Sequence, residues 1–222
     1  MDKSTTKNIR EKLHRMREPK KTAEMNALFT TVFILLTGIT LGLFAKWLDN
    51  LVLNNTVWWH RIVEILDLGN FFSEMAVWLL AALLIAVYSH SPFRAAWNVF
   101  AFFAGMCAAY HIYTILFSGF NPASYMLIWY GLTIISPILA VLCWYAKGSG
   151  IVPILLDVGI IAVFMLACFG VGFFYITFKG ILYLLVFVGA GASLYRTPKQ
   201  LLISLSIGTP LAFLFNLIWP YR

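Results

Sequence analysis

The sequence has few charged residues and very few acidic ones. Only 11% of its 222 residues are Asp, Glu, Lys or Arg, nine of these are acidic, and 61% of all residues are hydrophobic. Soluble domains contain about 25% charged and about 45–50% apolar residues, so this composition excludes an ordinary soluble domain. The mean hydropathy of +0.85 indicates a chain whose solvent is lipid.

The patterns that usually carry chemistry are also missing. Cys107, Cys143 and Cys168 fall in apolar segments without CxxC or Cys/His spacing, which predicts buried packing residues rather than a disulfide framework. The HExxH zinc motif and aspartate-rich pairs for Mg²⁺ are absent from the sequence. We therefore expect no cofactor and no metal ion. With no folded domain to present basic residues, we also expect no nucleic-acid partner.

The dominant feature that is present is a series of seven apolar segments. Each approaches the roughly 20 residues that a helix needs to cross the hydrocarbon core. They are Ala27–Trp47, Phe71–Tyr88, Ala95–Phe117, Tyr125–Tyr145, Ile151–Val171, Ile176–Leu194 and Leu201–Trp219. The sequence therefore predicts an all-α, polytopic membrane helix bundle of about seven transmembrane helices over residues 26–222, preceded by a basic segment over residues 1–25.

The distribution of basic residues predicts the orientation of the bundle. Eight of the 16 Lys and Arg residues lie within the first 21 positions, and positive residues next to a span tend to stay in the cytoplasm. With seven spans, twelve basic residues fall inside and four outside. We predict a cytoplasmic N-terminus and an external C-terminus, which requires a turn between Gly170 and Lys179 to separate spans five and six.

Two segments outside the spans are expected to form short helices. In the N-terminal segment, Asn8 and Glu11 fit a capping box and Pro19 a stop signal. Because each Lys or Arg gains about 1 kcal/mol near anionic lipids, residues 3–21 are expected to bind the inner leaflet of the bilayer. The external segment 50–70 predicts a helix in the outer interface, as an anchor or as a lid over an outer pocket.

Three ionisable residues stand out within the apolar segments, where a charge at the bilayer centre costs at least ~2.5–3.5 kcal/mol. Glu74 and His111 are about one turn from the outer end of their spans, close enough to reach water. Asp157 is about two turns into the fifth span and four residues after Pro153. A proline in a span frees a carbonyl that an ion can use, so Asp157 is a candidate for ion or proton binding. The alternative is a pairing role with a neighbouring helix.

Polar side chains gather at the outer ends of several spans. We predict that they line an externally open pocket for a small polar or amphipathic solute, with Glu74 and His111 as a proton-linked pair. The other candidate residues of this pocket are Asn70, Tyr110, Tyr113 and Lys179. The alternative is that these residues act as interfacial anchors and packing groups.

A short internal similarity suggests a repeat as one alternative for the architecture. Ser91-Pro92-Phe93-Arg94 and Thr197-Pro198-Lys199 both precede a span on the cytoplasmic side. The pairing would make spans one to three and five to seven parallel repeats around the fourth span, as in small carriers with a site between their halves. A proline beside a basic residue is also common in cytoplasmic turns.

The middle third of the chain carries a resemblance. Its residues are Ala76-Val77-Trp78-Leu79-Leu80, Ser91-Pro92-Phe93-Arg94-Ala95-Ala96, Ala109-Tyr110-His111-Ile112-Tyr113, Ser136-Pro137 and Cys143-Trp144-Tyr145-Ala146-Lys147. In order and spacing they resemble an uncharacterised family of small bacterial multi-pass membrane proteins, known only as a domain of unknown function. The resemblance implies a protein of the bacterial inner membrane and carries no activity, substrate or site residues.

The predicted function is that of a small-solute carrier, or of a solute-binding membrane subunit, with its site in the outer half of the bundle. We expect a non-enzymatic protein. A structural or accessory subunit whose polar rim contacts a membrane-protein partner is the first alternative. A lipid-modifying enzyme that uses Glu74 and His111 is the second.

Overall fold

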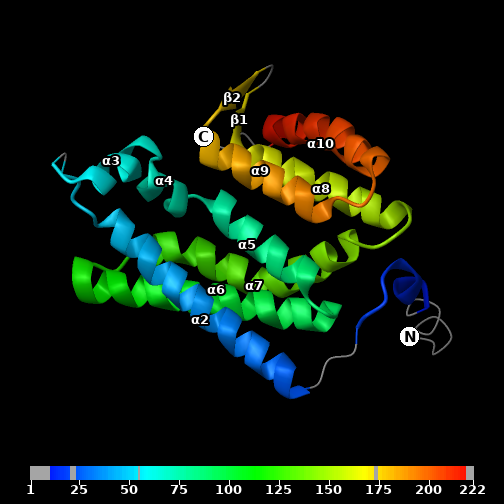
Figure 1. The fold of residues 1–222 in the computed structure, drawn as a ribbon, viewed down its shortest axis with the longest axis horizontal. Coiled ribbons are helices and arrows are strands. Elements are labelled where there is room, and N and C mark those ends of the chain that lie inside the picture. Colours follow the sequence, from blue (N-terminus) through cyan, green and yellow to red (C-terminus); the bar gives the residue numbers. More distant parts are fainter. Residues whose placement is uncertain (1–10, 21–23, 55, 173–174, 219–222) are drawn as a thin grey trace.

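The computed structural model describes residues 11–20, 24–54, 56–172 and 175–218. Helices run back and forth between two ends of an elongated bundle (Figure 1). The elements are α2 (Glu24–Asp49), α3 (Trp58–Ile65), α4 (Leu68–Ser73), α5 (Met75–Tyr88), α6 (Pro92–Tyr113), the π-helical turn η1 (Thr114–Ser118), α7 (Ala123–Ala146), α8 (Ile151–Cys168), β1 (Phe169–Val171), β2 (Ile176–Phe178), α9 (Ile181–Leu194) and α10 (Pro198–Ile218).

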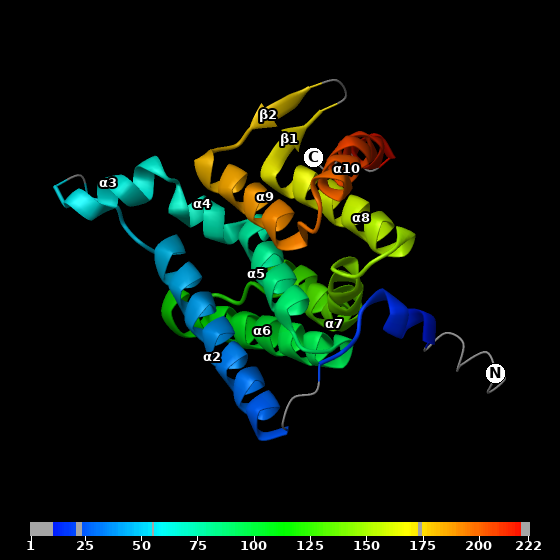
Figure 2. The ribbon, with the colours of Figure 1, turned by 45° about the vertical axis from the view of Figure 1, so that its right-hand side comes forward.

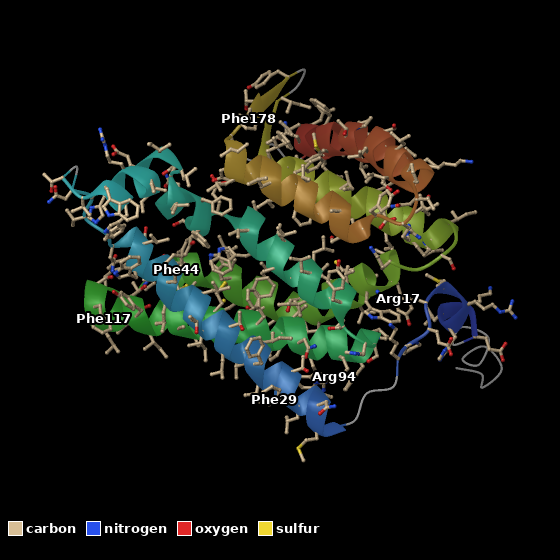
Figure 3. All side chains as sticks on the ribbon, in the orientation of Figure 1. Arg17, Phe29, Phe44, Arg94, Phe117 and Phe178 are labelled. Atoms are coloured by element: carbon tan, nitrogen blue, oxygen red, sulfur yellow. The ribbon has the colours of Figure 1, made fainter. Side chains whose placement is uncertain are left out.

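The two ends of the bundle differ in composition. At one end, which we call the basic end, helices α5, α7 and α9 finish and α6, α8 and α10 begin, and Arg17 and Arg94 lie there (Figure 3). The other end, which we call the loop end, carries α3, α4 and the β1–β2 hairpin (Figure 1). Phe117 lies toward the loop end (Figure 3).

Five of the described helices are long and apolar enough to cross a membrane. They are α2, α6 with η1, α7, α8 and α10. Helices α5 and α9 have only 14 residues each, which at 1.5 Å per residue gives a length of about 21 Å, less than the roughly 30 Å of the hydrocarbon core. An all-α architecture with several helices that can span a membrane is thus confirmed.

The predicted second span, Phe71–Tyr88, is wrong as a single helix. The chain is extended at Glu74, with φ −88° and ψ 162°, and this residue separates α4 from α5. The indole nitrogen of Trp78 donates a hydrogen bond to the Phe72 carbonyl at 2.9 Å. A side chain thus satisfies a carbonyl next to the break, which allows the helix to be interrupted.

The predicted spans five and six are each too long at the end where they meet. Helix α8 ends at Cys168 and α9 begins at Ile181, while β1 and β2 pair antiparallel between them. The residues of these strands are mostly aromatic or β-branched, which favours strands. A Cβ atom on Gly170 would lie 2.1 Å from Thr177 Oγ1, so a larger residue here would force the Thr177 side chain to move. The turn expected between Gly170 and Lys179 is therefore a β-hairpin.

The two helices predicted outside the spans are present in the described residues. Residues 11–16 are helical, while the expected N-cap, Asn8, lies outside the part of the chain that the structure describes. Helix α3 falls within the predicted segment 50–70. Its Trp58 and Ile65 are largely exposed, with 74% and 80% of their surface accessible.

Two apolar cores share helix α5. The first is built by α2, α5, α6 and α7, and the second by α5, α8, α9 and α10. Figure 2 shows α2, α6 and α7 on one side of α5 and α8, α9 and α10 on the other. In the first core, Cβ atoms on Gly38 and Gly42 would lie 2.3 and 2.5 Å from the carbonyl oxygens of Phe102 and Met106. These glycines let the backbones of α2 and α6 touch, as small residues do in membrane bundles.

The two halves of the chain follow the same plan. The first residues of α5 and α9, Met75 and Ile181, are 106 positions apart, as are Pro92 and Pro198, which begin α6 and α10. In each half the first helix packs on the third, α2 on α6 and α8 on α10. These features support two parallel three-helix units, α2–α5–α6 and α8–α9–α10, joined by α7.

The hydrogen bonds that begin the third helix of each unit also match. Ser91 Oγ accepts from the Arg94 backbone N–H at 3.2 Å, and Thr197 Oγ1 accepts from the Gln200 N–H at 3.2 Å. Ser91 and Thr197 are again 106 positions apart. Both helices therefore use an N-cap residue followed by proline, a combination that favours helix initiation.

Candidate functional site

A pocket opens between α4, α5, α6 and α7, and the space in and above it, open solvent included, is about 280 Å³. Five aromatic rings and three sulfur-containing side chains line it. The lining residues are Phe72, Trp78, Met106, Cys107, Tyr110, Tyr125, Met126 and Trp129. This lining suits the apolar part of a small molecule.

Polar groups surround the two tyrosines of the pocket. Tyr110 donates its phenolic hydrogen to Asp49 at 3.4 Å, and Tyr125 donates to the Ser73 carbonyl at 3.3 Å. Asp49 also pairs with Lys46 at 2.5 Å. The Lys46 ammonium is nearly buried, 4% exposed, and lies 5.2 Å from the centre of the Tyr110 ring. A ligand in this pocket therefore meets aromatic walls and a neutralised ion pair beside one of its tyrosines.

Glu74 is paired with Lys179. The Lys179 ammonium lies 2.8 Å from Glu74 Oε2 and donates a longer bond, 3.3 Å, to the Ala167 carbonyl. It also lies 5.3 Å from the centre of the Tyr183 ring. The pair joins the break between α4 and α5 to the connection between β2 and α9. Both side chains are partly exposed, so solvent screens their attraction.

His111 has partners other than Glu74. Its Nδ1 is bonded to the Tyr130 hydroxyl, and its Nε2 lies 2.9 Å from Asn121 Oδ1. The expected proton-linked pair of Glu74 and His111 is thus not a hydrogen-bonded pair in the structure. Among the described residues, each of the two has its own polar partner.

Asn70 and Tyr113, which were also predicted to line the outer pocket, contact residues close to them in the sequence. Asn70 donates to both carboxylate oxygens of Asp67 at 3.0 Å, and Asp67 itself has the left-handed φ of 48°. The Tyr113 ring packs on Phe117 with centroids 4.6 Å apart. Neither Asn70 nor Tyr113 lines the pocket. Tyr110 is the one predicted candidate that does.

Asp157 lies at the basic end, fully buried at 0% exposure. Its Oδ2 is paired with the Arg196 guanidinium and accepts a hydrogen bond of 2.6 Å from Gln200 Nε2. Arg196 precedes α10 and Gln200 is in its first turn, so the carboxylate joins α8 to α10. Gln200 Nε2 also lies 3.4 Å from Ser204 Oγ.

Basic side chains at this end cap the carboxyl ends of helices. Arg17 donates to the carbonyls of Val87 and Trp144, at 2.8 and 2.6 Å, near the ends of α5 and α7. Lys147 donates to the Ser193 and Tyr195 carbonyls at the end of α9. Cations at helix C-termini satisfy unpaired carbonyls and oppose the negative end of the helix dipole.

The cations of the basic end affect one another. Burial lowers the pKa of Lys147, and the nearby guanidiniums of Arg17 and Arg196 lower it further, while Asp157 opposes these effects. Asp157 is thus the carboxylate that faces Arg196 and Lys147, and Arg17 adds a third cation beside Lys147. This surplus of positive charge distinguishes the basic end from the loop end.

Sequence reasoning missed the pocket walls and the partners of Asp157. Trp78 and Trp129 belong to spans rich in aromatic residues, and no pattern separates a pocket wall from a lipid-facing ring. Arg196 and Gln200 had a signal that could have been used, since both lie near the start of span seven, on the side from which Asp157 enters span five. Spans five and seven start at the same end and run parallel, so packing of one on the other brings positions near their starts together.

No protein-family model, curated protein or solved structure matches this chain. Within the described ranges, no group of three or more His, Cys, Asp and Glu side chains is placed to hold a metal ion.

Proposed function

We propose that this protein is an integral membrane protein that binds a small amphipathic solute in the aromatic pocket at the loop end, as a carrier or as the solute-binding subunit of one. The proposal includes seven membrane passages, with α5 and α9 as short ones, and a cytoplasmic basic end. A place in the bacterial inner membrane is also proposed, on the sequence resemblance alone.

The apolar surface of the bundle supports the membrane part of the proposal. Large hydrophobic side chains are exposed along the helices, among them Phe29, Phe33 and Leu36 on α2 and Leu127 and Ile134 on α7. Monomeric soluble proteins rarely expose apolar patches this extensive. Lipid is the solvent that such a surface requires.

The pocket is the observation that carries the functional part. Its walls offer the faces of Trp78 and Trp129, which favour a flat apolar group. The phenolic oxygens of Tyr110 and Tyr125, whose hydrogens go to Asp49 and Ser73, can accept hydrogen bonds from a polar end of the same molecule. Because Lys46 already neutralises Asp49, the pocket favours a solute with no net charge.

Binding of indole and phenol to the purified protein tests the proposal. A ligand at 100 times its Kd stabilises the folded state by about 2.7 kcal/mol. For a chain of this size we expect the apparent Tm to rise by about 5–10 °C. Trp129→Ala, which removes a pocket wall, should abolish the rise.

Trp97→Ala is the matched control, because Trp97 lies on α6, is half exposed and does not line the pocket. It should keep the rise in Tm. The proposal fails if neither compound raises the Tm of the unmodified protein, or if Trp129→Ala and Trp97→Ala respond alike. Uptake of labelled indole into proteoliposomes then separates a carrier from a binding subunit.

The hairpin favours an accessory subunit as a second candidate function. Tyr175, Ile176 and Phe178 are exposed on a two-stranded sheet that projects from the bundle (Figures 1 and 3). Strand edges that face lipid leave backbone groups unpaired, and pairing with another protein would satisfy them. Tyr175→Ser with Phe178→Ser should then release a partner that co-purifies with the unmodified protein, without changing indole binding.

A further inference from the structure

The environment of Asp157 contains two buried polar atoms without partners. Within the part of the chain that the structure describes, Asp157 Oδ1 and Arg196 Nε have no hydrogen-bond partner. Oδ2 of the same carboxylate holds both Arg196 and Gln200. A buried carboxylate usually has all of its hydrogen bonds satisfied, so an open oxygen here requires an explanation.

The first repeat unit shows how the same helix contact is made without a carboxylate. Arg94 and Asn98 of α6 occupy the positions 106 residues before Gln200 and Ser204 of α10. Both contact Thr31 of α2: Arg94 donates to Thr31 Oγ1, and the Thr31 hydroxyl donates to Asn98 Oδ1 at 2.7 Å.

The comparison separates what the fold needs from what Asp157 adds. In each unit a polar residue of the first helix reaches the third and seventh residues after the N-cap of the third helix. Thr31 contacts both directly, whereas Asp157 contacts Gln200 directly and Ser204 through Gln200. In the first unit, α2–α5–α6, the neutral side chain of Thr31 is sufficient to make this helix contact. Burying a charge is far more costly than burying a hydroxyl, so packing of α8 on α10 does not account for the carboxylate.

We propose that Asp157 is a proton-binding site, in which a proton from the basic-end solvent binds Oδ1 and releases Arg196 from the carboxylate. The neutral acid keeps its contact with Gln200 through Oδ2. The second unit then has a neutral acceptor between its first and third helices, as the first unit already has. Arg196, whose side chain is 18% exposed, then has the Gly148 carbonyl as its remaining side-chain partner among the described residues and can turn toward solvent.

The groups facing Asp157 are consistent with this exchange. Arg196 comes from the connection before α10, Gln200 and Ser204 come from α10, and Lys147 comes from the connection between α7 and α8. Arg17 is the next cation outward, close to Lys147. Neutralising the only carboxylate in this group leaves three cations together, and their repulsion favours movement of Arg196 away from the bundle.

The role that we assign to this proton site is to couple a proton to solute movement. That role rests on the proposed carrier function. The test of the proton site does not depend on a solute. Infrared difference spectra of the protein in lipid nanodiscs, taken from about pH 8 to about pH 4, report protonated carboxyl groups by their C=O stretching band. We expect a component of this band in the unmodified protein that Asp157→Asn removes.

Glu74→Gln is the matched control, because Glu74 is also paired with a cation but lies at the loop end. It should keep the component that Asp157→Asn removes. Asp157→Thr copies the chemistry of Thr31 and should fold while lacking the component. Arg196→Gln removes the counter-ion and should increase the proton affinity of Asp157 at least tenfold.

The inference is wrong if the component is absent from the unmodified protein or survives in Asp157→Asn. It is also wrong if Arg196→Gln leaves the midpoint of the component unchanged, a comparison that stands even if neither Asp157 variant folds. If the component appears but indole and phenol do not bind, the proposed carrier function fails and the proton site stands.

Discussion

Replacement of Arg17 by Gln should destabilise the bundle, although Arg17 lies outside every membrane helix. The guanidinium makes two charge-assisted hydrogen bonds to the Val87 and Trp144 carbonyls, and it lies 4.3 Å from the centre of the Trp144 ring. Hydrogen bonds to charged groups contribute about 1.5–3 kcal/mol each, and a cation–π contact about 0.5–1 kcal/mol at exposed sites. The gross loss is therefore about 3.5–7 kcal/mol.

The net loss is smaller because water can replace part of these contacts. Arg17 is only half-buried, and the helix ends that it caps lie next to solvent at the basic end. We expect a loss of about 2–3 kcal/mol. At about 2–4 °C per kcal/mol for a chain of this length, the apparent Tm in detergent should fall by about 4–12 °C.

Arg15→Gln is the control that removes the same charge from the same segment. Arg15 is exposed, so its replacement should change the apparent Tm by less than about 2 °C. If Arg17→Gln and Arg15→Gln have the same apparent Tm, the helix-capping role assigned to Arg17 is wrong.

Three further predictions concern other contacts. Gly38→Val should lower the free energy of unfolding by at least about 2 kcal/mol in denaturant titrations, because its Cβ would lie 2.3 Å from a backbone oxygen, whereas Gly131→Val, with nothing within 4 Å, should be nearly neutral. Glu74→Gln and Lys179→Met should each cost less than about 1 kcal/mol by the same titration, since their ion pair is partly exposed. The pKa of Lys147 is lower in the folded state than in the unfolded chain. The unfolded chain therefore binds more protons as the pH rises from the folded pKa toward the usual value of 10.5, so folding stability should rise over that alkaline range. Lys147→Met should lose this rise in Tm measured against pH.

Uniform apolar segments made some of the helices predictable from sequence. The expected spans Ala27–Trp47 and Tyr125–Tyr145 lie within α2 and α7 and stop within a few residues of their ends. A long apolar run in lipid has only one way to satisfy its backbone, which is to continue the helix. The prediction of continuous helices failed in two places. Next to Glu74 the Trp78 side chain satisfies the Phe72 carbonyl, and in the hairpin β1 and β2 satisfy each other's backbone groups.

The candidate site was predictable only where a residue was unusual for its surroundings. Asp157 stood out because it is an acid within an apolar segment, and the structure confirms that it is buried. Its partners depend on α8 and α10 being neighbours, which hydropathy does not report. The rings of Trp78 and Trp129 were not recognised as pocket walls, because lipid-facing and pocket-facing aromatic residues look alike in sequence.

The two 14-residue helices, α5 and α9, lie against each other, with Gly189 of α9 packed on the Leu80 side chain of α5. If both helices cross the bilayer as proposed, their length of about 21 Å gives the membrane voltage a shorter distance over which to fall, so the electric field there is steeper than across the long helices. Moving one elementary charge through the whole potential releases or costs about 2.3 kcal/mol per 100 mV. A charge that moves beside α5 and α9 exchanges a larger share of that energy for each ångström of its path.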